Sequence, residues 1–196
     1  MDAILRRGAG FLAALLLAVA VSAGCSDSNN KPVPLGESGT PSASAEPSPS
    51  YATDDPVQAL LGWFDALYQA QRSLNPDHPG LVKYGQGPAL AGARKRIASF
   101  KAQGVRLDKP GTVSQPRITD SGRVRGKKVN EVTVCVITPP DEFVDVKTGQ
   151  LRAPKERAAG NKTITTRFVG VMVLMPDGWH IDGNELEDVA NCAAIR

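Results

Sequence analysis

The 196-residue sequence predicts an α+β domain, with N-terminal helices packed on an antiparallel sheet and preceded by a signal peptide and a disordered linker. In the first half of the domain, apolar residues recur at helical spacing. From Val105 onward the spacing changes to the period of two that is typical of strands. Because the helices precede the strands and do not alternate with them, an antiparallel α+β architecture is favoured over a parallel α/β one.

The first helix is predicted from Val57 to Tyr68, where the apolar residues form one stripe. Thr53 and Asp54 are candidate N-caps, and Asp55-Pro56 suits the first turn, where a carboxylate and a missing N–H are both favourable. Asn75-Pro76 is expected to end this helix. The members of the stripe are Val57, Leu60, Leu61, Phe64, Leu67 and Tyr68.

A second long helix is predicted from Ala89 to Gln103, with Gly104 as its C-terminal cap. It would bury Leu90, Ala93, Ile97 and Phe100. A short helical turn is expected between the two helices, over residues 81–84.

Six strands are expected after Gly104, and the last part of the fifth is apolar on both faces, which predicts a central position. Asp120-Ser121-Gly122 and Pro176-Asp177-Gly178 are the expected turns. The acidic stretch 182–188 departs from the calcium-loop pattern and is expected to be a solvated turn. The predicted strands cover residues 105–107, 112–118, 129–138, 143–146, 163–175 and 179–181.

The N-terminus has the pattern of an export signal. Arg6 and Arg7 precede a run without charge from Gly8 to Gly24, which is too short for a permanent membrane span. Its end, Val21-Ser22-Ala23-Gly24-Cys25, resembles the lipobox of bacterial lipoproteins. The resemblance implies a signal peptide over residues 1–24 and a lipid on Cys25.

Two alternatives remain for this segment. Ala18-Val19-Ala20 fits an ordinary signal peptidase site, which would release a soluble secreted protein, and Cys25 would then be only a small residue near the cleavage site. Residues 25–53 are expected to form a disordered linker, because residues 26–50 are rich in Ser and Pro and contain no aromatic residue.

Residues 54–196 resemble exported lipoproteins with a nuclear transport factor 2-like (SnoaL-like) domain. The resemblance rests on the helix over 57–68 with Trp63, the segment 81–90, the strands over 132–136 and 167–175, and Asp177-Gly178-Trp179-His180-Ile181. It implies a cone-like fold, in which the helices pack on a curved sheet.

The two remaining cysteines, Cys135 and Cys192, form an even pair if Cys25 carries lipid. An exported protein meets oxidising conditions, so a disulfide is the expected state. The alternative is two buried free thiols that pack as small apolar residues.

Charge and composition exclude several classes of function. The net charge of +3 is too small for a dedicated nucleic-acid binder, so no nucleic-acid partner is expected. Two histidines at no metal-ligand spacing predict no metal, and no cofactor motif occurs. Basic residues on the second helix and at 123–128 are interpreted as solvated faces, or as a surface attracted to anionic lipid headgroups.

These observations predict a non-catalytic accessory module that binds a small apolar ligand or an envelope protein. It would be anchored at the extracytoplasmic face of the cell membrane. Candidate cavity-wall residues are Phe64, Tyr68, Tyr84 and Trp179, unless they serve only as core. The alternatives are a structural envelope component or an enzyme with an acid–base pair in the cone. For that enzyme, residues of suitable type are Asp65, Tyr68, His78, Tyr84, Asp120 and Asp145.

Overall fold

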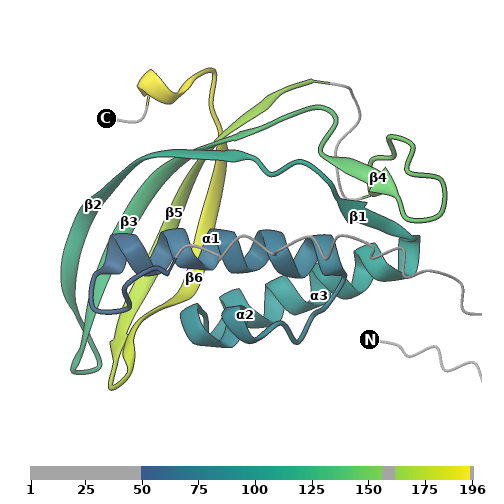
Figure 1. Ribbon diagram of the computed structural model, residues 1–196. Helices are drawn as coiled ribbons and strands as arrows, with labels where there is room; N and C mark the ends of the chain where they lie inside the picture. Colours follow the sequence, from purple (N-terminus) through teal and green to yellow (C-terminus); the bar gives the residue numbers. More distant parts are fainter. Residues whose placement is uncertain (1–49, 156–161, 195–196) are drawn as a thin grey trace, which may run out of the picture. The chain divides into compact units, whose positions relative to one another are not determined.

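The computed structural model describes residues 50–155 and 162–194 (Figure 1). Three helices come first: α1 (Pro56–Ser73), α2 (Pro79–Tyr84) and α3 (Gly87–Gln103). The strands follow as β1 (Val105–Leu107), β2 (Thr112–Val124), β3 (Lys127–Thr138), β4 (Phe143–Asp145), β5 (Ile164–Met175) and β6 (Gly178–Asp188), and then the short 3-10 helix η1 (Cys192–Ala194).

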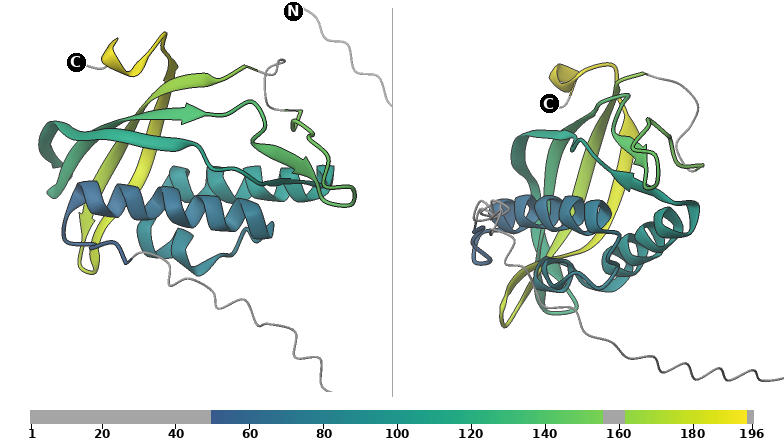
Figure 2. Two further views of the ribbon diagram at one scale, coloured as in Figure 1. Left: turned by 45° about the horizontal axis from the view of Figure 1, so that its top comes forward. Right: turned by 45° about the vertical axis from the view of Figure 1, so that its right-hand side comes forward.

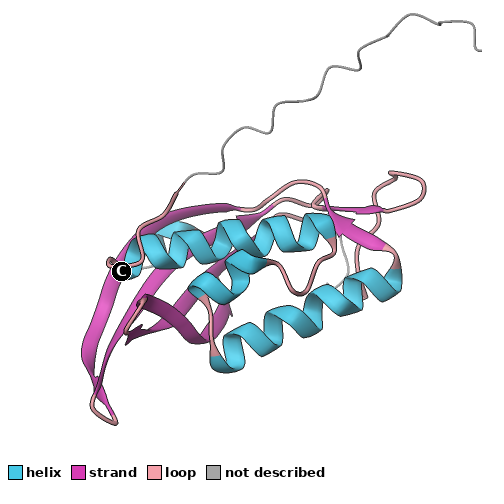
Figure 3. Cartoon of the chain, turned by 60° about the horizontal axis from the view of Figure 1, so that its bottom comes forward, coloured by secondary structure: helices cyan, strands magenta, loops and turns pink. Residues whose placement is uncertain are grey.

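The main sheet has four antiparallel strands in the order β2-β3-β5-β6, and β1 and β4 form a separate antiparallel pair. Figures 1 and 2 show the sheet curving, with the helices on its concave side. Figure 3 shows α2 between α1 and α3. The predicted α+β class with helices on a curved antiparallel sheet is therefore confirmed, as is the central position of β5.

The helix α1 is longer than the apolar stripe predicted. Its N-cap is Asp55, whose carboxylate accepts a hydrogen bond of 2.8 Å from the Gln58 N–H. The helix continues past Tyr68 to Ser73 and ends at Leu74, which adopts φ 52°. The second long helix ends as expected at Gly104, with φ 67°.

The main core lies between α1 and the concave face of the sheet. Leu60, Val132, Val134 and Met172 are fully buried there. The approach of α1 depends on Gly170 of β5, because a Cβ at residue 170 would lie 3.1 Å from Leu60 Cδ1. A smaller cluster of Phe100, Val105, Leu107 and Phe143 lies between α3 and the β1–β4 pair.

The turn predicted at Asp120-Ser121-Gly122 is wrong. These residues belong to β2 and pair with Glu131, Asn130 and Val129 of β3. The turn comes later, at Arg125-Gly126, where both residues have positive φ (51° and 80°), as tight hairpins require. The hairpin turn therefore forms at Arg125-Gly126, although Asp120-Ser121-Gly122 is also a typical turn sequence.

The last strand is also longer than predicted. The acidic stretch 182–188 is not a turn but continues β6, which pairs with β5 as far as Asp188. Because β6 is an edge strand, its carboxylates at Glu185, Glu187 and Asp188 stay exposed while the backbone pairs. Arg167 of β5 adds an ion pair of 3.2 Å with Glu187.

Cys135 and Cys192 form a disulfide, with Cα atoms 5.6 Å apart and 57 positions between them in sequence. Cys135 is fully buried in β3. The disulfide therefore attaches the C-terminal 3-10 helix to a central strand of the sheet.

The residues just before α1, expected to end the linker, contact the domain. The Thr53 carbonyl accepts a hydrogen bond of 2.7 Å from the Trp179 N–H, and the Tyr51 carbonyl accepts one of 3.2 Å from the Tyr84 hydroxyl. Within the described residues, no helix combines the length and the apolar character needed to cross a membrane. Cys25 and the predicted signal peptide lie outside the described residues.

Candidate functional site

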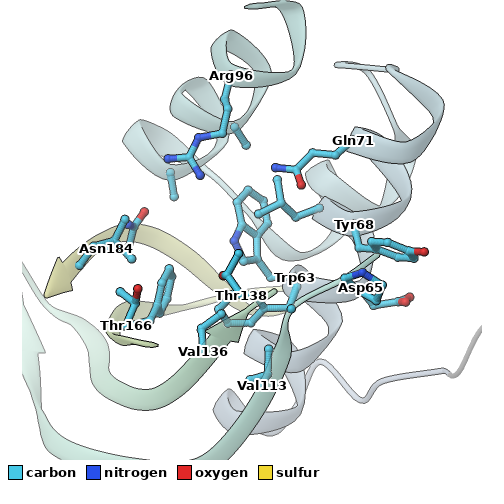
Figure 4. A pocket seen from close by; sticks show the side chains of 18 of the residues that line it. Trp63, Asp65, Tyr68, Gln71, Arg96, Val113, Val136, Thr138, Thr166 and Asn184 are labelled. Atoms are coloured by element: carbon cyan, nitrogen blue, oxygen red, sulfur yellow. The ribbon is translucent and has the colours of Figure 1, made fainter. Parts of the chain in front are cut away.

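A cavity of about 790 Å³ opens between the concave face of the sheet and the helices α1 and α3 (Figure 4). This volume falls within the usual range of small-molecule sites, roughly 300–1,000 Å³. Apolar side chains contribute from every layer: Phe64 from α1, Ala93 from α3, Val113 from β2, Val136 from β3 and Phe168 from β5. The cavity is thus a mainly apolar space that the core leaves unfilled.

The Gln71 side chain is the most informative polar group of this cavity. It is only 7% exposed, and it has no hydrogen-bond partner in the described part of the chain. Figure 4 shows its amide pointing into the cavity from α1. The amide is not among the buried polar atoms that lack a partner in the described residues, which are Arg94 Nε, Arg117 Nε and Asn130 Oδ1. Its nitrogen and oxygen therefore reach the cavity space, where water or a ligand can bind them.

Trp63 lies about two helical turns before Gln71 in α1. Its indole is 3% exposed, lines the cavity and lies next to the Gln71 amide in Figure 4. The indole N–H is a donor only, whereas the amide both donates and accepts. Both side chains could therefore donate a hydrogen bond to an oxygen atom placed in the cavity.

Aromatic rings form part of the apolar wall. Phe64 and Phe168 meet edge to face, with ring centroids 4.9 Å apart. This contact joins α1 to β5 and fixes both rings at the cavity surface. The packing of α1 against β5 therefore also holds this part of the cavity wall in place.

The outer part of the cavity is polar. Thr138, Thr166 and Asn184 come from three strands, and Arg96 comes from α3. Thr166 donates a hydrogen bond of 3.3 Å to Asp188, whereas Arg96 is exposed and forms no ion pair with any described residue. A cation therefore stands at the rim, opposite the two hydroxyl groups.

Tyr51 also borders the cavity. Burial raises the pKa of its hydroxyl above the ordinary value of 10.0, and the negative charge of Asp65 and the nearby Tyr84 add to the effect. The Tyr51 hydroxyl therefore stays neutral at physiological pH and acts as a hydrogen-bonding group.

The four predicted wall residues separate into two pairs. Phe64 and Tyr68 line the cavity. Tyr84 and Trp179 lie instead in the core, 6% and 3% exposed, away from the cavity lining. The Tyr84 ring covers Gly62, and Lys128 Nζ lies 5.5 Å from the Trp179 ring centroid, so both rings are used in packing.

The residues considered for acid–base chemistry do not converge. Only Asp65 and Tyr68 border the cavity, and Figure 4 shows the Asp65 carboxylate and the Tyr68 hydroxyl directed away from Gln71 and Trp63. Asp65 accepts a hydrogen bond of 2.9 Å from Gln69, and the Tyr68 hydroxyl donates to the Asp108 carbonyl at 3.3 Å.

The other acid–base candidates have local structural roles. His78 Nδ1 accepts the Gly80 N–H at the start of α2, Asp145 binds Arg152 and Asp120 accepts the Ser121 N–H. His180 Nε2 lies 3.1 Å from Asp177. Among the described residues, no three His, Cys, Asp or Glu side chains are grouped so that they would hold a metal ion.

The sequence analysis missed Gln71 as a site residue. Its signal was present, because Gln71 follows Leu60, Phe64 and Leu67 at positions +11, +7 and +4 and so interrupts the apolar stripe of α1. A polar residue on the buried side of an amphipathic helix indicates either a core hydrogen bond or a site. Trp63, in contrast, could not be distinguished from core by any spacing.

No protein-family model matches the sequence, and no curated protein matches it significantly. Solved structures do resemble the fold. The intermembrane-space region of the chloroplast protein ARC6 is 18% identical, with a TM-score of 0.46, over 72% of this chain and 100% of that chain.

Two other similar structures are bacterial. A nuclear transport factor 2-like protein from Cytophaga hutchinsonii gives a TM-score of 0.39 at 12% identity, over 69% of this chain and 99% of that one. A ketosteroid isomerase-like protein from Erwinia carotovora atroseptica gives 0.36 at 10% identity, over 68% and 92%. The fold described above rests on this chain's own strand order and helix packing.

Proposed function

We propose that this protein is a membrane-tethered, extracytoplasmic binding module that holds a small, mainly apolar ligand in the cavity without converting it. The ligand would have an apolar body and one oxygen acceptor, such as a carbonyl, hydroxyl or carboxylate group. The observation that carries the proposal is the Gln71 amide, 93% buried and directed into the cavity without a described partner.

The cavity walls support the apolar part of the ligand. Phe64, Val136 and Phe168 face a space large enough for a molecule of drug-like size. An oxygen atom placed near Gln71 and Trp63 would receive hydrogen bonds that the protein alone leaves unmade. A site built in this way discriminates strongly against ligands that lack the oxygen, because its buried polar groups would then stay unpaired.

Binding without turnover agrees with the directions of Asp65 and Tyr68, the two predicted acid–base candidates that border the cavity. A general acid or base must reach the proton it transfers, at about 2.6–3.2 Å or through one water. Asp65 accepts a hydrogen bond from Gln69 and the Tyr68 hydroxyl donates one to the Asp108 carbonyl, and Figure 4 shows both groups directed away from Gln71.

The predicted export signal and the lipobox-like sequence support the proposed location. We propose that lipid on Cys25 holds the module at the outer face of the cytoplasmic membrane, with residues 25–53 as its linker. Substitution Cys25→Ala should move the protein from the membrane fraction to the medium or stop its export. An unchanged distribution between the fractions would contradict the anchor and leave the cavity proposal intact.

The cavity is tested with the fluorescent probe 1-anilinonaphthalene-8-sulfonate, an aromatic body with an anionic group. Val136→Phe places a larger ring inside the cavity, whereas Ile137→Phe makes a similar change on the opposite face of β3. We expect the wild type and Ile137→Phe to bind the probe and Val136→Phe to bind at least tenfold more weakly.

Near-UV circular dichroism of each variant verifies that the probe meets a folded domain, because loosely packed states bind this probe unspecifically. Gln71→Leu provides a second variant that keeps the cavity volume nearly constant. Equal probe binding by the wild type, Val136→Phe and Ile137→Phe would contradict the proposal.

A further inference from the structure

We infer that the β2–β3 hairpin tip, residues 123–128, is a docking surface for the headgroups of an anionic phospholipid bilayer. Four of its six residues are cationic, and all six are exposed. None of the four forms an ion pair with a described residue, and no carboxylate occurs in the tip itself. The cationic residues are Arg123, Arg125, Lys127 and Lys128.

The tip also carries an exposed apolar side chain. Val124 is 60% exposed between Arg123 and Arg125. Cations that flank an exposed apolar residue suit the boundary between headgroups and acyl chains, where the charges meet phosphate and the apolar group leaves water. Exposure of this valine to water alone is not favourable, whereas burial among acyl chains would remove its apolar surface from water.

The position of the tip in the fold agrees with this role. Val129 pairs with Val173, so the β2–β3 and β5–β6 tips lie at the same end of the sheet, as Figures 1 and 2 show. Lys127 Nζ lies 3.4 Å from Met175 Sδ, which joins the two tips. The Trp179 N–H, just beyond the second tip, binds the Thr53 carbonyl, so the chain enters the domain at this same end.

The connection toward the predicted lipid anchor therefore leaves from the end that presents the cations. Two carboxylates at this end have other partners, since Asp177 contacts His180 and Asp55 caps α1. The inference does not need the anchor, because the tip itself carries the charges, and it is independent of the ligand in the cavity.

The test uses sedimentation with vesicles made of equal parts phosphatidylglycerol and phosphatidylcholine, compared with vesicles of phosphatidylcholine alone. All proteins are the mature chain from residue 25 onward with Cys25→Ser, so that neither the apolar signal peptide nor a lipid contributes to binding. Arg125→Asn with Lys127→Gln removes two charges from the tip, and Asn suits the positive φ at residue 125. Lys95→Gln with Lys101→Gln removes two exposed charges from α3 as the matched control.

We expect the tip variant to bind anionic vesicles roughly 30-fold more weakly than the parent, at the usual contribution of one surface charge. The α3 control should bind within about threefold of the parent, and salt of about 1 M should abolish binding because the Debye length falls to about 3 Å. Equal losses in both variants, equal binding to neutral vesicles, or tighter binding to duplex DNA at the same phosphate concentration would overturn the inference.

Discussion

The aromatic ring of Tyr84 lies directly on Gly62 of α1, so closely that a Cβ at residue 62 would be 2.6 Å from Tyr84 Cζ. The Tyr84 hydroxyl reaches past α1 to the Tyr51 carbonyl. This contact attaches α2 to α1 and to the beginning of the domain. It also explains why Tyr84 packs in the core, where its side chain is 6% exposed.

Gly62→Ala should destabilise the domain. In a helix, replacing Gly by Ala normally raises the free energy of unfolding by up to about 1 kcal/mol. Here the new methyl group would overlap the Tyr84 ring, and such overpacking costs about 1–3 kcal/mol. Gly92→Ala in α3 is the control, because a Cβ there meets nothing within 4 Å. Urea unfolding should show a lower free energy of unfolding for Gly62→Ala and a higher one for Gly92→Ala. A higher free energy of unfolding for both variants would contradict the contact between Gly62 and Tyr84.

Gln71→Leu should stabilise the ligand-free protein. The substitution replaces a 7% exposed amide that makes no described hydrogen bond by an apolar side chain of similar size, so the free energy of unfolding should rise by up to about 1 kcal/mol. Gln58→Leu, exposed on the same helix, should change it by less than about 0.5 kcal/mol. A loss of stability in Gln71→Leu would show that Gln71 serves the fold and not a ligand.

Removal of the disulfide should cost about 4 kcal/mol by the chain-entropy model, given the 57-position separation of Cys135 and Cys192. The double variant Cys135→Ala/Cys192→Ala should therefore melt well below the wild type in calorimetry. Cys25→Ala is the control with no expected change. If the melting temperature of the double variant equalled that of the wild type, the disulfide would not constrain the folded chain.

Asp145 should make stability depend on acid pH. The Arg152 guanidinium, followed by the N–H groups of Thr148 and Lys147, lowers the pKa of Asp145 from 3.8 to about 2. Because the folded pKa lies below the unfolded one, this contribution is complete above about pH 4 and is lost as pH falls toward 2.

Asp145→Asn should therefore be less stable than the wild type at pH 7, and the difference should shrink between pH 4 and pH 2. Arg152→Gln should produce the same narrowing, because it removes the main cause of the shift. Urea unfolding between pH 4 and pH 2 measures the difference in free energy of unfolding between each variant and the wild type. A difference that stays constant down to pH 2 would argue against the ion pair.

The helices and the two central strands could be predicted from the sequence because burial on one or both faces leaves a periodic pattern. The stripe of α1 and the alternation of Val132, Val134 and Val136 are such patterns. The C-cap at Gly104 could be predicted from the local sequence, because helices commonly end in a residue with positive φ, a conformation that glycine adopts readily.

Edge strands and the cavity could not be predicted in the same way. β6 is held by backbone pairing with β5, and its exposed carboxylates leave no apolar pattern beyond Ile181. The choice between wall and core for an aromatic residue depends on contacts between elements. Trp63 and Trp179 are each 3% exposed, yet only Trp63 borders the cavity.

Native mass spectrometry tests the central claim most directly. The protein is purified gently from membranes of the cells that produce it and measured alongside Val136→Phe and Ile137→Phe. We expect the wild type and Ile137→Phe to carry a non-covalent small-molecule mass that dissociates on activation, and Val136→Phe to lack it. A wild type that shows only the mass of its covalent chain, or the same adduct on all three proteins, would contradict a ligand in this cavity.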